Sequence, residues 1–142
     1  WRTTLTSGDT RSQFVVFSVE ISVPRTMAEG ADRGGVTSTP LLVAFPEEPD
    51  GLLLPICAGL PVSEAARFPF LLNADWELTT SREAVREGSP WNLHLRSAAA
   101  SFFADAAIHE LIRPRLAAYL PTATGDRSSF WQAFVEEAVE AL

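Results

Sequence analysis

The stretch FPFLLNADWELTTSREAVREGSPWNLHL, residues 68–95, contains the point at which the chain changes from a strand pattern to a helix pattern. Its first part, Phe68–Thr79, is rich in aromatic and aliphatic residues and predicts a strand. Its last part opens with Ser89-Pro90. This pair predicts the start of a long helix, because Ser caps the first turn and Pro fits the first helical position.

Between these parts, Ser81–Arg86 predicts one or two helical turns. Thr80 or Ser81 would cap this short helix, since either hydroxyl can accept a hydrogen bond from a free N–H group of the first turn. Gly88 would end it before the long helix begins.

Upstream of residue 68, the chain predicts four more strands. Apolar residues at nearly every second position, or in short continuous runs, mark them. These strands cover Trp1–Ser7, Gln13–Val23, Pro40–Phe45 and Leu52–Leu60. Turn or loop residues separate them at Gly8–Thr10, Thr26–Ser38 and Pro46–Gly51. The short links favour antiparallel pairing of consecutive strands.

Downstream of residue 90, apolar residues recur at helical spacing as far as Ile112 and predict one long helix. Pro114 should kink or end it, because proline has no backbone N–H to donate. Leu116–Leu120 completes this element. A final amphipathic helix follows, with Asp126 or Ser128 as its cap.

Strands over residues 1–79 and helices over residues 80–142 predict an α+β fold. The expected architecture is a two-layer sandwich, in which helices cover one face of a mostly antiparallel sheet of about five strands. With a length of 142 residues, the chain is expected to form a single domain.

The composition argues against several classes of protein. Acidic residues outnumber basic ones by 18 to 11, every basic residue is Arg, and the net charge is −7. Such a surface does not suit nucleic acid or an anionic membrane. No apolar run approaches the ~20 residues that span a bilayer. Cys57 is the only cysteine of the sequence, which excludes an internal disulfide and a cysteine-cluster metal site.

The chain begins with Trp1 instead of Met, already within a strand pattern. We interpret it as a piece of a longer protein. It contains no basic segment followed by an apolar one, as a secretory signal would have. Because it also lacks a disulfide pair, we expect a cytoplasmic location.

Glycines and histidines offer two candidate sites, each with a plainer interpretation. Gly30–Gly35 has the glycines of a phosphate-binding loop but no P-loop lysine, which favours a surface loop. His94 and His109 lie on the predicted long helix at a spacing other than i, i+4. Solvated or capping roles are therefore favoured over a metal pair or a catalytic base.

The remaining candidates are a thiol and pairs of carboxylates. Cys57 lies between Ile56 and Ala58, which favours a buried, inert thiol over a nucleophile. The adjacent pairs Glu47-Glu48 and Glu136-Glu137 are expected to be solvated. The sequence therefore predicts no catalytic residue and no metal ligand.

Arg82 is the favoured candidate for a binding residue. Its place between the predicted strand and the long helix would allow its planar guanidinium to reach a phosphate outside the domain. The alternative is a local ion pair with Glu83 or Glu87.

Several segments around Arg82 match a known family in order and spacing. They are Ala44-Phe45-Pro46, Leu60-Pro61, Phe68–Trp76, Ser81-Arg82-Glu83 and Ser89-Pro90-Trp91-Asn92. Over roughly residues 1–120, and most densely over Phe68–Leu95, the chain resembles the segment that follows the ATP-binding domain in sacsin-type proteins. These belong to the wider group of gyrase, heat-shock-chaperone, histidine-kinase and MutL-like ATPases.

The resemblance implies a transducer or middle domain, a two-layer α/β sandwich related to a ribosomal-protein domain. The ninety-kilodalton heat-shock chaperone has a similar Ser-Arg-Glu, whose Arg reaches the terminal phosphate of ATP. By this analogy Arg82 senses the phosphate, supported by Ser81, Glu83, Asn73, Trp91 and Asn92. ATP and Mg²⁺ would be bound by an upstream ATP-binding domain. This chain alone lacks that domain's motifs and should not hydrolyse ATP.

The sequence thus leaves two main hypotheses. In the first, the chain couples the nucleotide state of an upstream domain to rearrangement of domains or partners. In the second, it is a nucleotide-independent interaction or dimerisation domain. Phe130, Trp131 and Phe134 of the final helix would either dock a neighbour, including a second copy, or fill the domain's own core. A free-standing hydrolase using His94 or His109 is a remote third hypothesis.

Overall fold

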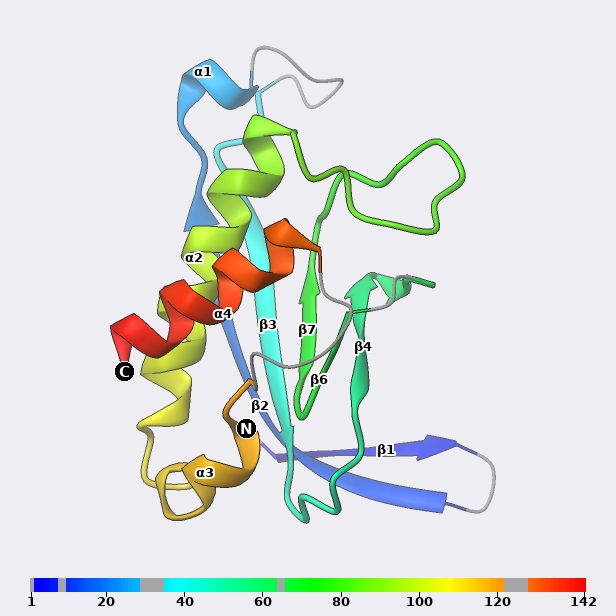
Figure 1. The fold of residues 1–142 in the computed structure, drawn as a ribbon, viewed down its shortest axis with the longest axis vertical. Helices are drawn as coiled ribbons and strands as arrows, with labels where there is room; N and C mark the ends of the chain where they lie inside the picture. Colours follow the sequence, from blue (N-terminus) through cyan, green and yellow to red (C-terminus); the bar gives the residue numbers. More distant parts are fainter. Residues whose placement is uncertain (1, 8–9, 29–34, 64–65, 122–127) are drawn as a thin grey trace.

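The computed structural model describes residues 2–7, 10–28, 35–63, 66–121 and 128–142. These parts of the chain form two layers, a sheet and a set of helices on one of its faces (Figure 1). The predicted α+β fold and the mostly antiparallel sheet are confirmed. Within these ranges, no helix is long and apolar enough to cross a membrane.

Five strands of at least four residues lie side by side in the described ranges, in the order β1-β2-β3-β7-β4. They are β1 (Arg2–Ser7), β2 (Thr10–Ser22), β3 (Ser38–Pro46), β7 (Leu71–Ala74) and β4 (Leu54–Ala58). Two strands of two residues, β5 (Leu60–Pro61) and β6 (Arg67–Phe68), pair with β4. All pairs are antiparallel except β4 with β7, which is parallel.

Around β4 and β7 the sheet differs from the sequence prediction. The strand predicted over Leu52–Leu60 is interrupted at Gly59, whose φ of +76° turns the chain between β4 and β5. The strand predicted over Phe68–Thr79 ends at Ala74. β7 also lies between β3 and β4, so consecutive strands are not all antiparallel neighbours. This central place buries Leu72 and Ala74, which an edge position would leave partly in water.

α2 (Pro90–Ala107) begins as predicted, with the Ser89 hydroxyl accepting a hydrogen bond from the Asn92 N–H at 3.4 Å. It ends at Ala107, earlier than expected. Pro114 lies in a short 3₁₀ helix, η1 (Arg113–Arg115), and α3 (Leu116–Tyr119) follows. At the start of that new helix, proline's missing N–H removes no hydrogen bond.

The remaining elements are α1 (Arg25–Ala28), a single turn that overlaps the start of the predicted loop 26–38, and α4 (Ser129–Ala141). Ser128 occupies the N-cap position of α4, but its side chain makes no capping hydrogen bond. Asp126, the turn residues Gly8 and Asp9, and most of Gly30–Gly35 lie outside the described residues.

A cluster of buried aromatic rings joins the two layers. Phe70 lies near its centre, with ring centroids at 4.5 Å from Phe103 of α2, 5.2 Å from Phe68 and 5.9 Å from Phe45 of β3. Phe134 of α4 completes this set at 6.4 Å from Phe70. Because each ring is fully buried, the cluster holds the sheet and both long helices together.

Replacing Phe70 by Ala should therefore lower the free energy of unfolding by ~3–5 kcal/mol. Chemical denaturation, followed by Trp fluorescence, measures this change. Leu60→Ala is the matched control, because Leu60 is 77% exposed and should change stability by less than ~0.5 kcal/mol. Equal effects of the two substitutions would contradict the position assigned to the aromatic cluster.

Candidate functional site

Residues 77–86, here named the Arg82 loop, form a small hairpin beyond the end of β7 (Figure 1). Leu78 and Val85 face each other in an antiparallel bridge. The Arg86 N–H donates to the Glu77 carbonyl, and the Thr79 N–H donates to the Ala84 carbonyl, both at 2.8 Å. The helical turns predicted over Ser81–Arg86 are therefore wrong.

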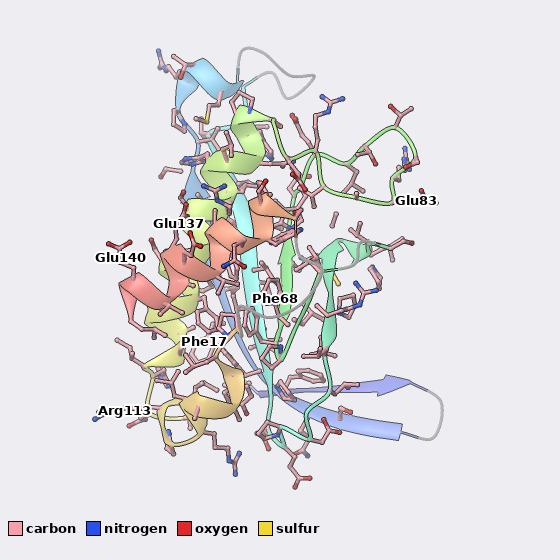
Figure 2. All side chains as sticks on the ribbon, in the orientation of Figure 1. Phe17, Phe68, Glu83, Arg113, Glu137 and Glu140 are labelled. Carbon is pink, nitrogen blue, oxygen red and sulfur yellow. The ribbon has the colours of Figure 1, made fainter. Side chains whose placement is uncertain are left out.

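The tip of the hairpin contains the candidate residues Ser81, Arg82 and Glu83, all of them exposed. The Arg82 N–H donates to the Thr79 carbonyl at 2.8 Å and closes a tight turn. The φ of Arg82 is +60°, the left-handed conformation that favours glycine and costs other residues ~1 kcal/mol. Figure 2 shows Glu83 at this tip, on the side of the molecule away from α4.

Asn92 fixes the base of the loop to the first turn of α2. Its side chain is fully buried. Its Oδ1 accepts from the Glu77 N–H, and its Nδ2 donates to the carbonyls of Glu77 and Arg86, all at 2.8 Å. One amide thus holds both arms of the hairpin, and these contacts favour a hairpin over a helix in this segment.

The side chain of Glu77 adds a second link between the loop and the helix. The Ser89 hydroxyl, which caps α2, donates to the Glu77 carboxylate. Nη1 of Arg86 lies 4.0 Å from Oε2 of the same carboxylate. Sequence reasoning missed Glu77 and Arg86. The signal available was Leu78 and Val85 on either side of a polar run, the pattern of a hairpin.

The two remaining candidates, Trp91 and Asn73, make hydrogen bonds within the domain. Nε1 of Trp91 donates to the Asp75 carbonyl at 2.8 Å, which holds the chain that leads into the loop. Asn73 lies on β7, and its Oδ1 accepts from the Gly59 N–H at 2.9 Å. Asn73 therefore supports the turn between β4 and β5 and is not part of the Arg82 loop.

Within the described ranges, no carboxylate forms an ion pair with Arg82. The local pairing of Arg82 with Glu83 or Glu87, the alternative left open by the sequence, does not occur in this structure. The guanidinium is exposed at the end of a hairpin whose backbone is held by hydrogen bonds at both tip and base. This arrangement can present a cation to a group outside the domain.

Both histidines interact within the domain. Nε2 of His94 lies 2.9 Å from the Ser22 carbonyl at the end of β2. The ring of His109 lies 5.1 Å from that of Phe17, edge to face. In the described part of the chain, no three His, Cys, Asp or Glu side chains gather as a metal site would require.

For the aromatic residues of the final helix, α4, the sequence left two alternatives: docking a neighbour or filling the domain's own core. Phe130, Trp131 and Phe134 are buried, so they fill the domain's own core and do not provide an apolar docking surface. Glu137, expected in solvent, pairs with Arg96 of α2 at 2.7 Å.

A shallow depression of about 330 Å³ lies between α2 and α4. Two serines, two glutamates and an alanine line it: Ser97, Ser101, Glu137, Glu140 and Ala141. Figure 2 shows Glu137 and Glu140 along this side of α4. Because the charged groups on its lining are carboxylates, the depression does not suit an anionic ligand such as a nucleotide.

Comparison of the chain with protein-family models, curated proteins and solved structures finds no match. The resemblance of Phe68–Leu95 to sacsin-type proteins therefore stays a prediction. The functional argument rests on the geometry of the Arg82 loop.

Replacing Asn92 by Ala should destabilise the domain by ~2–4 kcal/mol, because backbone groups of Glu77 and Arg86 lose a buried partner. Amide hydrogen exchange should accelerate across residues 77–86 more than in β3. Ser81→Ala, at the exposed tip, is the control and should leave exchange at the loop's base unchanged. Unaltered exchange in the Asn92 variant would show that the amide does not hold the loop.

Burial raises the pKa of the Cys57 thiol, so at any pH near 8 a smaller share is thiolate than for a free cysteine. We expect alkylation of the folded protein to be roughly 100-fold slower than alkylation of the unfolded chain. Mass spectrometry over a pH series measures both rates. Equal rates in the two states would contradict an inert, buried thiol.

Proposed function

We propose that this chain is a transducer-like domain of a chaperone-like ATPase, and that Arg82 contacts the terminal phosphate of ATP held by an upstream ATP-binding domain. The observation that carries the proposal is the exposed guanidinium at the tip of a hairpin whose base is fixed by Asn92. The resemblance around Ser81-Arg82-Glu83 supports it.

The chemistry of the guanidinium suits this role. Its rigid, planar fork of N–H donors can bind two phosphate oxygens in a fixed geometry, whereas the lysine ammonium acts as a point charge without that directionality. A hairpin already ordered before contact loses little conformational freedom on binding. In this proposal ATP and Mg²⁺ belong to the upstream domain, and this chain supplies no catalytic step of its own.

The coupling mechanism requires a contact that differs between nucleotide states. Arg82 would reach the terminal phosphate of ATP and lose that contact in the ADP state, which shifts the equilibrium between two domain arrangements. Because Asn92 bonds the base of the loop to the first turn of α2, a displacement of the loop would also displace the start of this helix. The proposal places this coupling in the cytoplasm.

The alternative is a nucleotide-independent interaction or dimerisation domain. An exposed Arg82 would then bind a carboxylate or phosphate on another protein, for which its guanidinium is equally suited. The sequence upstream of residue 1 distinguishes the two functions. The proposed function requires a nucleotide-binding domain there, and the alternative does not.

In the full-length protein, Arg82→Ala should lower kcat for ATP hydrolysis by ~100-fold or more and change the Kd for ATP by less than about threefold. Steady-state hydrolysis and a direct binding titration measure the two quantities. The 142-residue chain alone should show no hydrolysis.

Arg86→Ala is the matched control, because it removes the same charge from the same loop at a side chain that is 62% exposed. It should leave kcat within about threefold of the wild type. Arg82→Gly removes the cation while relaxing the left-handed backbone, and should reproduce the loss of turnover. Full turnover in both Arg82 variants would exclude the phosphate contact.

A further inference from the structure

Among the described residues, no strand lies beside part of one edge of β2. β1 pairs with β2 only as far as Val15, which lies opposite Arg2. β3 pairs with the other side of β2 from Phe14 to Ser22. In the described part of the chain, the β1 side of β2 is therefore open over residues 16–22.

The alternation of the strand shows which backbone groups face this opening. The carbonyl of Gln13 and the N–H of Val23 both bond toward the β3 side, at 2.8 Å and 2.9 Å. Because backbone groups alternate along a strand, odd-numbered residues of β2 bond to β3. The N–H and carbonyl groups of Ser18 and Glu20 therefore point to the open edge.

Side chains at this edge also leave room for a strand. Phe17, Val19 and Ile21 pack against the core on the helix side but remain partly exposed. Ser18 and Glu20 are exposed on the other face. An added strand would cover these three half-buried apolar side chains. It would also give hydrogen-bond partners to the backbone N–H and carbonyl groups of Ser18 and Glu20.

α2 and the turn that follows it contact β2 near the same edge, which limits what can fit there. His94 bonds to the Ser22 carbonyl, and His109 packs on Phe17. The Ser22 carbonyl is thus already occupied, so an added strand would end opposite Ile21. A second copy of this domain would bring its own α2 against this one, whereas a single strand would not.

We propose that the segment directly before residue 1 continues β1 along the open edge of β2. The inference rests on the proposed function, in which this segment links the domain to the upstream ATP-binding domain. β1 runs antiparallel to β2, so a chain that enters β1 in line must pass beside Ile21, Val19 and Phe17. It would enter at the Ser22 end of β2, where α2 begins and the Arg82 loop is anchored.

The register predicts the sequence of this segment. Arg2 lies opposite Val15, so the first, third and fifth residues before residue 1 lie opposite Phe17, Val19 and Ile21. Directly opposite residues of an antiparallel pair share one face. These three positions should therefore be apolar, and the two between them polar.

Amide hydrogen exchange tests the added strand directly. In the full-length protein the Ser18 and Glu20 amides should exchange at least ~10-fold more slowly than in the 142-residue chain, while the Val19 amide is protected in both. Equal exchange of Ser18 and Glu20 in the two proteins would overturn the proposal, as would charged residues at the three predicted apolar positions.

A proline variant gives a second readout. Ser18→Pro removes an N–H that faces only the open edge, and Pro40 of β3 already shows that this sheet holds a proline inside a strand. The substitution should lower Tm by roughly 3 °C or more in the full-length protein and by much less in the 142-residue chain. Ser18→Ala, which keeps the N–H, should change neither. An equal shift in both proteins contradicts an added strand.

These results are independent of the phosphate contact. Loss of turnover in Arg82→Ala together with unprotected Ser18 and Glu20 amides overturns the strand and retains the proposed function. Protected amides with full turnover in Arg82→Ala retain the strand and overturn the phosphate contact.

Discussion

Burying the amide of Asn92 requires hydrogen-bond partners for its polar atoms, since each buried polar group left without a partner costs ~1–3 kcal/mol of stability. The backbone of Glu77 and Arg86 supplies these partners. The two arms of the Arg82 loop must therefore meet at the first turn of α2. Capping of the helix by Ser89 and the closure of the hairpin then share one small network, through the Glu77 carboxylate. The position of the Arg82 backbone follows from this constraint.

The aromatic cluster around Phe70 makes that arrangement stable, because it holds α2 and α4 against the sheet. Its rings come from β3, from the turn before β7 and from both long helices. Cohesion is thus concentrated in the middle of the molecule. The exposed tip of the Arg82 loop and the edge of β2 that no described strand covers both lie away from this cluster. Both are related to the start of α2, one through Asn92 and the other through His94. An upstream domain at that end of the molecule would be within reach of both.

Local chemistry explains which elements the sequence predicts correctly. Ser89-Pro90 specifies the start of α2 by itself, and the alternation in β2 and the apolar run in β3 predict strands whatever their neighbours. Errors occur where distant contacts decide. Ser81–Arg86 has a helix-compatible composition, but its conformation depends on Asn92. The place of β7 between β3 and β4 depends on which strand gains most from burial. Pro114 lies within a separate 3₁₀ helix, η1, beyond the end of α2. Of the candidate site, the sequence singles out Arg82 and, through the resemblance alone, Asn92, whereas Glu77 and Arg86 emerge only from the fold.

The account of function depends on whether Arg82 meets a phosphate that belongs to another domain. Photo-cross-linking of the full-length protein, with an ATP analogue that carries its reactive group on the terminal phosphate, tests this most directly. The account predicts label in the peptide that contains residues 77–86, and none there from an analogue that carries the reactive group on the base. Label confined to other parts of the protein with both analogues would contradict it.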